Sequence, residues 1–197
     1  MSETLLALIV FAFVTTITPG PNNVMLTASG ANFGFLRTLP HMLGITFGFP
    51  VMVIAVGLGA AQLLQDSPEL HRAVKVMGAA YLLWLAWHIA RAGRGDTTTT
   101  ARAPMGFWGA AAFQWINPKA WMMLAGALPA FTSVGGDLIG EVLMIAIVFV
   151  LACLPSCAVW CAFGVGIGKM LGSDRALRNF NWAMAGLLVA SVLAMLR

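Results

Sequence analysis

The chain has 197 residues, of which 60% are apolar and only 9% are charged, and its net charge is +4. A soluble domain carries roughly 25% charged residues, so this composition excludes a water-soluble globular protein. The mean hydropathy of +0.88 agrees. The basic residues lie in short segments between apolar stretches, which predicts a membrane orientation and no nucleic-acid partner.

Six stretches are apolar over the length that a bilayer-crossing helix needs, about 20 residues. They are too long for barrel strands and lack the apolar–polar alternation of such strands. Helices satisfy their own backbone hydrogen bonds in lipid. The sequence therefore predicts an all-α integral membrane protein, with residues 1–197 forming a single transmembrane domain in the lipid bilayer. In chain order the expected spans are Thr4–Ala28, Leu39–Leu64, Leu70–Ile89, Phe107–Phe131, Leu138–Gly168 and Ala176–Leu196.

The polar segment 93–104 divides the chain into two halves, about 1–92 and 105–197, and each half holds three spans. A repeat with an odd number of spans must face opposite ways in the membrane, which is the inverted-repeat plan of many transporters. Prolines interrupt the first span of each half. We therefore expect two inverted three-helix repeats in which helices 1 and 4 are broken.

The break in the first span consists of two prolines around a glycine, followed by two amides. Each proline removes a backbone donor and clashes with the preceding turn, so nearby carbonyl groups need partners from protein, water or a ligand. The two asparagines are expected to cap the second half-helix and aim its N–H groups at an anion such as a carboxylate. The alternative is a plain proline kink. The residues are Thr18-Pro19-Gly20-Pro21-Asn22-Asn23.

Ser29-Gly30-Ala31-Asn32 is predicted to start the first loop. The two spans after this loop hold weaker candidates for the functional site. His41 begins the second span, where a histidine is usually structural, with a proton-linked group as the alternative. Lys75 and Tyr81 lie on the third span and are candidate substrate contacts, although Lys75 is close enough to the loop to reach the interface instead.

The break in the fourth span is Asn117-Pro118-Lys119. Lys119 lies twelve residues into an apolar stretch, about 18 Å along a helix. An ammonium inside the bilayer is expensive, so it should face the bundle interior or water. The alternative is a span that starts only at Lys119. In inverted repeats the two breaks would face each other near the midplane, and together they suit an anionic or zwitterionic solute.

Cys153, Cys157 and Cys161 share one helical face because they are four residues apart. Such a row can indicate a thiol- or metal-handling transporter. No histidine or acid joins the row, so we expect no metal site and no cofactor. A membrane enzyme is a further alternative, but Ser29 with His41 is its one candidate pair and no G-x-S-x-G elbow is present. An enzyme is therefore not expected.

The distribution of charge predicts orientation and cargo. Seven basic residues lie in the odd-numbered loops, against three in the second loop and at the C-terminus, so the odd loops are expected in the cytoplasm. Every acidic residue lies in a loop or at a span end, which disfavours a purely cationic ligand. The seven basic residues of the odd-numbered loops are Arg37, Arg91, Arg94, Arg102, Lys169, Arg175 and Arg178.

These residues resemble the LysE/RhtB family of amino-acid exporters. The resemblance covers essentially the whole chain, and the Pro-Gly-Pro and Asn-Pro-Lys pair is its more specific part. The resemblance implies efflux of amino acids or their derivatives across a bacterial inner membrane, driven by the proton gradient. Because no acidic residue lies deep in a span, we expect an exporter of neutral amino acids or zwitterionic derivatives that works by alternating access. The matching segments are Thr18–Asn23, Ser29-Gly30, Gly34-Phe35, Gly44-Ile45, Lys75–Leu82 and Asn117–Ala120.

Two further points follow from the resemblance. The segments Tyr81–Trp87 and Phe107–Trp115 look most like the cysteine and O-acetylserine branch, with the homoserine and threonine type as the other possibility. Members often carry an acid in the fifth span, but Val148–Phe163 has none. This departure makes a lysine or arginine cargo less expected and leaves the location of proton coupling open. Small-residue faces allow a homodimer.

Overall fold

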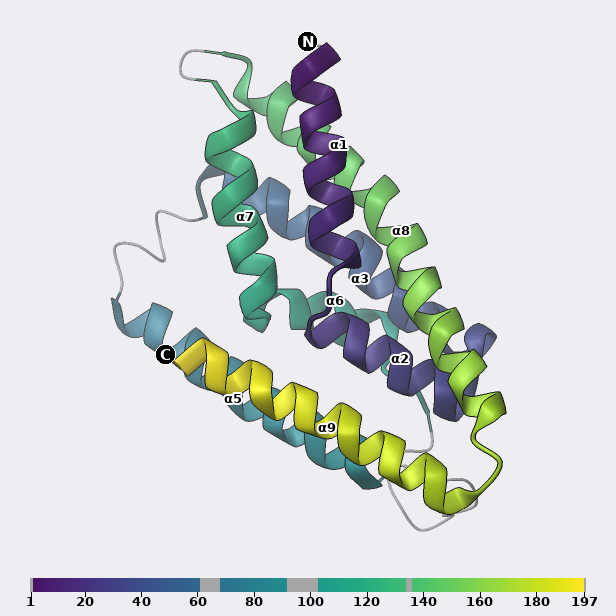
Figure 1. Cartoon of the computed structure of the whole chain (residues 1–197). Coiled ribbons are helices and arrows are strands. Elements are labelled where there is room, and N and C mark those ends of the chain that lie inside the picture. Colours follow the sequence, from purple (N-terminus) through teal and green to yellow (C-terminus); the bar gives the residue numbers. More distant parts are fainter. Residues whose placement is uncertain (1, 61–67, 92–102, 134–135, 197) are drawn as a thin grey trace.

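The structure is a computed structural model that describes residues 2–60, 68–91, 103–133 and 136–196 (Figure 1). Their regular structure is helical throughout, as the sequence predicts, and none of these residues forms a strand. The elements are α1 (Ser2–Ile17), α2 (Pro21–Phe33), α3 (Phe35–Ala55), the π-helical turn η1 (Val56–Ala60), α5 (Pro68–Arg91), α6 (Phe107–Phe113), the 3-10 turn η2 (Gln114–Ile116), α7 (Pro118–Phe131), α8 (Leu138–Met170) and α9 (Asp174–Leu196).

Three helical segments of the described chain are long and apolar enough to cross a membrane: Phe35–Gly59, Leu138–Met170 and Asp174–Leu193. The pair α1 and α2 qualifies as a fourth if it is one span bent by 54°. The chain is therefore a multi-pass membrane protein with broken helices at the two predicted places. The linker predicted at 93–104 falls almost entirely outside the described residues.

The prediction that Ser29-Gly30-Ala31-Asn32 starts a loop is wrong, because α2 continues through these residues to Phe33. Their polar groups are satisfied inside the bundle. The hydroxyls of Ser29 and Thr38 lie 2.8 Å apart in a hydrogen bond, and Asn32 exchanges two amide hydrogen bonds with Asn181 of α9. Residues that are typical of loops therefore form contacts between helices here.

The first connection is instead a single residue. Gly34 has φ of 83°, a left-handed conformation that glycine adopts without steric cost. Because α3 starts directly after it at Phe35, Arg37 lies in the first turn of α3 and not in a loop. Its guanidinium carbon lies 5.9 Å from the centre of the Phe33 ring.

The long helix α8 is the centre of the bundle and packs against α1, α2 and α3. Phe149 of α8 packs edge-on against Phe49 of α3, with ring centres 4.9 Å apart, and both rings are buried. In contrast, α5 and α9 run side by side along their lengths (Figure 1). They are joined to the rest through an apolar cluster that includes Met25 and Phe113.

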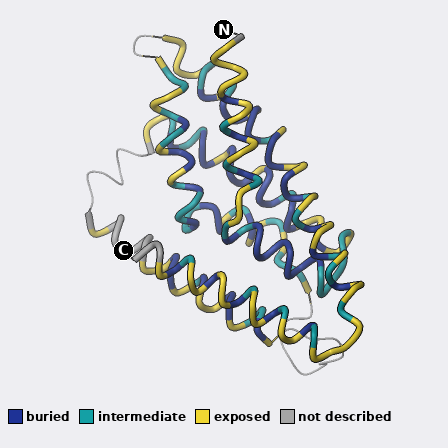
Figure 2. The backbone as a smooth tube through the Cα atoms, viewed as in Figure 1, coloured by how far each residue is buried: buried dark blue, intermediate teal, exposed yellow. Residues whose placement is uncertain are grey.

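Exposed residues lie along the outer sides of the helices (Figure 2), and many of them are large and apolar. Leu151 of α8, Trp108 of α6 and Met122 of α7 are each at least two-thirds exposed. A soluble monomer rarely leaves so much apolar surface in water, and the surface has the character of one that faces lipid.

Glycines allow close contacts between helices. Gly44 and Gly48 of α3 lie against the backbone of α6, and Gly164 and Gly168 of α8 lie against the backbone of α2. A Cβ atom at Gly164 would collide with the carbonyl oxygen of Thr27.

We therefore expect Gly164→Ala to force α2 and α8 apart and to lower the free energy of unfolding by about 1–3 kcal/mol. Gly166→Ala is the matched control, because Gly166 is two residues away in the same helix and its Cβ would meet open space. That variant should be as stable as the parent or more so, since alanine favours helix. The thermal unfolding midpoints of the purified proteins compare the two, and equal losses would contradict the close packing of α2 on α8.

Candidate functional site

The first break lies between Ile17, the last residue of α1, and Pro21, the first of α2. Side chains bind carbonyl groups that have no helical donor at the break. The Asn23 amide donates to the carbonyl oxygens of Thr16 and Thr18, at 2.9 and 2.8 Å, and the Trp160 indole donates to Ile17 at 2.9 Å. The broken backbone is thus held by protein donors.

The prediction that Asn22 and Asn23 cap α2 is wrong. Gly20 is the N-cap residue, and no side chain bonds to the helix start. The two asparagines lie inside the first turn, where Asn23 turns back to the end of α1 and Asn22 reaches Gln114. The Asn23 side chain therefore connects α2 to the end of α1, and the Asn22 side chain connects α2 to η2.

Lys119 crosses from the second break to the first. Its ammonium donates to the carbonyl oxygen and the hydroxyl of Thr18, the latter at 2.9 Å, and to the carbonyl oxygen of Pro19 at 3.4 Å. The side chain is half-buried and runs directly beside Gly20, where a Cβ atom would lie 2.6 Å from the Lys119 Cδ. The glycine therefore leaves the space in which the lysine lies.

The second break has its own cap. Asn117 precedes α7, and its side-chain oxygen accepts from the backbone N–H of Lys119 at 3.1 Å. Pro118 fills the first helical position, where its missing donor costs nothing. The Trp121 indole donates to the carbonyl oxygen of Trp115 at 2.8 Å. This geometry fixes the direction in which the Lys119 side chain leaves α7.

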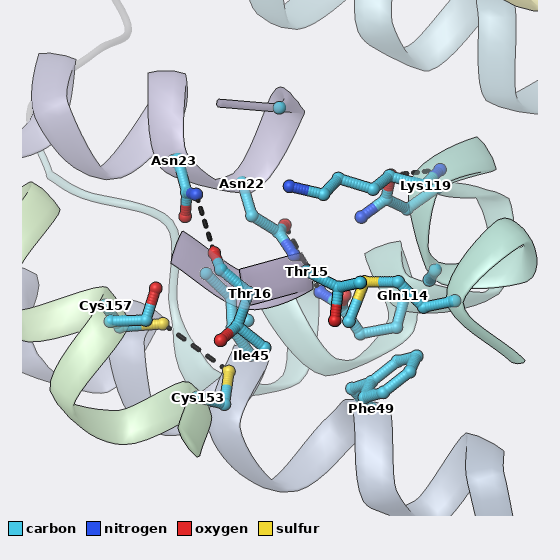
Figure 3. Close-up of a pocket in the computed structure, with 15 residues that line it drawn as sticks. Thr15, Thr16, Asn22, Asn23, Ile45, Phe49, Gln114, Lys119, Cys153 and Cys157 are labelled. Carbon is cyan, nitrogen blue, oxygen red and sulfur yellow. Dashed lines mark hydrogen bonds between the residues drawn. The ribbon is translucent and has the colours of Figure 1, made fainter. Parts of the chain in front are cut away.

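A small pocket, with a cavity volume of about 30 Å³, lies between the two breaks, α3 and α8 (Figure 3). Asn22 donates to Gln114 at 2.9 Å across it, and Gln114 is itself 1% exposed. We call this the break pocket. Its lining residues are Thr15, Thr16, Gly20, Asn22, Asn23, Ile45, Phe49, Gln114, Asn117, Lys119, Ala120, Met123, Cys153, Ser156 and Cys157.

Helix α8 contributes three of these side chains opposite the breaks. The sulfur atoms of Cys153 and Cys157 lie 3.7 Å apart. Ser156 is 1% exposed, and its hydroxyl has no hydrogen-bond partner among the described residues. Cys161 is buried away from the pocket, against Gly30 of α2. In the described part of the chain, no three His, Cys, Asp or Glu side chains gather as metal ligands.

The structure brings five of the predicted site residues onto the break pocket: Gly20, Asn22, Asn23, Asn117 and Lys119. Thr18 and Pro19 bind the Lys119 ammonium from the first break, while Pro21 and Pro118 begin helices.

Tyr81 is not among the described residues that line the break pocket. Tyr81 stacks on Trp84, with ring centres 5.4 Å apart, and lines a second cavity. Lys75 belongs to α5, but its side chain lies outside the described part of the structure.

Sequence reasoning missed Gln114, Ser156 and Trp160. Gln114 offered a usable signal, because an amide inside an apolar span needs a partner. Ser156 and Trp160 offered none, since serine and tryptophan are ordinary in membrane helices and their partners lie on other elements.

The alternative of a membrane enzyme requires Ser29 and His41 to act as a pair. The Ser29 hydroxyl bonds instead to Thr38, and neither ring nitrogen of His41 has a hydrogen-bond partner in the described structure. A nucleophile and its base need such a bond. The structure therefore does not bring Ser29 and His41 together as a nucleophile and its base.

Comparison with known proteins identifies relatives of this chain. The chain is 29% identical over 189 residues to the cysteine/O-acetylserine efflux protein of Klebsiella pneumoniae, covering 94% of this chain and 84% of that protein. Identity to the Escherichia coli protein of the same name is 29% over 188 residues, with the same coverage. The Salmonella typhimurium protein is 32% identical over 109 residues, 55% of each chain. No solved structure matches. Residues 13–196 match the family described as LysE type translocator, so the chain belongs to that family of transporters.

Proposed function

We propose that this chain is a secondary transporter that exports neutral amino acids or zwitterionic derivatives across a bacterial inner membrane by alternating access. Cargo of the cysteine and O-acetylserine type is favoured over the homoserine and threonine type, because the names of the relatives include the former. The observation that carries the proposal is Lys119, which borders the break pocket and reaches from one helix break to the polar groups of the other.

The chemistry of the pocket suits a zwitterion. In the structure the Lys119 ammonium is held by neutral oxygens of Thr18 and Pro19. A carboxylate is the stronger acceptor, because hydrogen bonds between ionised partners are about twice as strong as neutral ones. A substrate carboxylate would therefore draw Lys119 from Thr18 and loosen the connection between the breaks. This exchange links binding to movement of the two halves.

The remaining lining groups complete the proposed contacts. The amide groups of Asn22, Asn23 and Asn117 supply donors and acceptors, and Gly20 borders the same site. No acidic side chain is among the lining residues that the structure describes, which disfavours lysine or arginine as cargo. Pro118 orients Lys119, while Lys75 and Tyr81 stay candidates for contacts elsewhere on the path.

Six spans arranged as two inverted repeats are part of this proposal. The first span of each half packs against the second span of the other half, since α2 contacts α8 and α6 contacts α3. The third spans, α5 and α9, pack together. These reciprocal contacts support a pseudo-two-fold relation between the halves.

A position of the break pocket near the bilayer midplane is also supported. Helix α8 has 33 residues, about 50 Å of helix, against a hydrocarbon core of about 30 Å. Cys153 and Cys157 lie near its middle. Cytoplasmic odd-numbered loops, contact of the exposed apolar side chains with lipid, and a homodimer remain predictions of this proposal.

One observation favours a second candidate function. Cys153 and Cys157 line the break pocket, as a thiol- or metal-handling transporter would require. A variant in which Cys153, Cys157 and Cys161 are all alanine separates the two ideas. Full amino-acid export by that variant would remove the thiol- and metal-handling function.

Counterflow in proteoliposomes tests the proposal directly. Vesicles loaded with one unlabelled amino acid are placed in trace radiolabelled amino acid, with no ion gradient. We expect transient accumulation of label with cysteine, O-acetylserine, homoserine or threonine, and none with lysine or arginine. The absence of counterflow with every neutral amino acid would overturn the proposal.

A further inference from the structure

A second cavity, with a volume of about 340 Å³, lies between α2, α3, α5 and residues 103–105. His41 of α3 lines it together with Ser29, Asn32, Tyr81, Trp84 and His88. His41 is 2% exposed, and neither of its ring nitrogens has a hydrogen-bond partner among the described residues. A buried polar group without a partner is costly to the fold, so a use for this imidazole is expected.

The second cavity and the break pocket follow one another along the same two helices. His41, Ile45 and Phe49 are spaced four residues apart on α3 and share one face. His41 lines the second cavity, whereas Ile45 and Phe49 line the break pocket. Helix α2 behaves in the same way, with Asn22 on the break pocket and Asn32 on the second cavity. His41 is thus one helical turn from the pocket wall.

Few groups around His41 can carry charge. From α5 the cavity receives Tyr81 and His88, and the latter bonds through Nδ1 to the carbonyl oxygen of Trp84 at 2.8 Å. Arg37 lies one turn before His41 on α3, beside Phe33 of the cavity wall. From α2 come only uncharged side chains among the described lining residues. The imidazole therefore has no described carboxylate beside it.

We propose that His41 is the group that binds and releases the coupling proton, an inference that rests on the proposed export function. An exporter driven by a proton gradient needs a side chain that changes charge near neutral pH, and imidazole is the side chain that does so. The deep segments of this chain offer no aspartate or glutamate for the purpose. One proton from the outer side binds a ring nitrogen of His41 after cargo release, and the same proton leaves to the inner side before the next cargo is exported.

The cost of a charged imidazole explains the coupling. Protonated His41 would sit in a buried, largely apolar wall near Arg37, which is unfavourable unless the cavity opens to water. Protonation therefore favours a conformation in which the second cavity is wet, and deprotonation favours the closed packing. The state of one side chain thereby biases the two conformations that alternating access requires.

His41→Gln tests the proposal, because glutamine keeps a polar side chain and cannot carry the proton. Purified protein in proteoliposomes is assayed twice with radiolabelled cysteine or O-acetylserine, whichever the wild type exchanges. The first assay is counterflow without a gradient, and the second is accumulation driven by an imposed pH gradient. We expect His41→Gln to retain counterflow within about twofold and to lose at least about tenfold of gradient-driven accumulation, as for removal of an essential coupling.

His88→Gln is the matched control, since it makes the same change in the same cavity at a histidine that has a backbone partner. It should keep both activities. Gradient-driven accumulation by His41→Gln at the wild-type level would overturn the proposal, as would a wild type indifferent to the pH gradient. Loss of both activities in His41→Gln and also in His41→Asn would assign His41 to structure or cargo binding instead. Absence of counterflow in the wild type would be a failure of the export function itself.

Discussion

Replacing Lys119 with methionine should lower amino-acid export about 10- to 100-fold while the protein remains in the membrane. A hydrogen bond to a charged group contributes about 1.5–3 kcal/mol, and each 1.4 kcal/mol is a factor of ten. Methionine keeps the length and apolar stem of the side chain but cannot bind Thr18, Pro19 or a substrate carboxylate. Initial rates of counterflow, corrected for the amount of protein inserted, measure the effect.

Lys169→Met is the matched control for this change. Lys169 lies in the last turn of α8 with an exposed side chain, far along the helix from the residues that line the break pocket. Its replacement removes the same charge and should leave the rate unchanged. Wild-type export by Lys119→Met, with Lys169→Met equally active, would contradict the role of Lys119.

Replacing Asn23 with leucine should lower the free energy of unfolding by about 1–3 kcal/mol. The Asn23 amide donates to the carbonyl oxygens of Thr16 and Thr18, and the Thr18 oxygen also accepts from the Lys119 ammonium. Leucine therefore leaves the buried Thr16 carbonyl without its side-chain donor, and such a buried acceptor costs about 1–3 kcal/mol. Thermal unfolding of the purified protein in detergent should show the loss as a clearly lower midpoint.

Asn179→Leu makes the same substitution at an exposed position of α9 and should shift the midpoint little. If Asn23→Leu were as stable as Asn179→Leu, the first break would not depend on the Asn23 amide. Asn23 does not cap α2, so the expected loss of stability comes from the carbonyl group of Thr16 at the end of α1.

The positions of the helices and their breaks could be predicted from the sequence because both depend on local chemistry. Long apolar stretches give the helices, and α6 to α7 begins at Phe107 and ends at Phe131 as expected. A proline has no backbone N–H to donate in any surroundings, so the breaks at Pro19 and Pro118 could also be predicted. Lys119 could be predicted as a site residue because an ammonium within an apolar stretch must find polar protein groups or water.

The partners of these groups could not be predicted, because they depend on helix packing. The Trp160 indole satisfies Ile17 from 143 residues away in the chain, and Gln114 meets Asn22 across the break pocket. The error at Ser29-Gly30-Ala31-Asn32 has the same origin. These residues are typical of loops, yet they continue α2. Ser29 and Asn32 make side-chain hydrogen bonds with Thr38 of α3 and Asn181 of α9.

The central claim is that the cargo occupies the break pocket, and labelling of Cys157 tests it most directly. Cys157 lines the pocket, whereas Cys161 on the same helical face does not. Variants that retain one of these cysteines, with the other two replaced by alanine, are treated with a small charged thiol reagent. A transported amino acid at about ten times its Kd should slow labelling of Cys157 about tenfold and leave the rate at Cys161 unchanged. Equal labelling rates of Cys157 with and without that amino acid would contradict the claim.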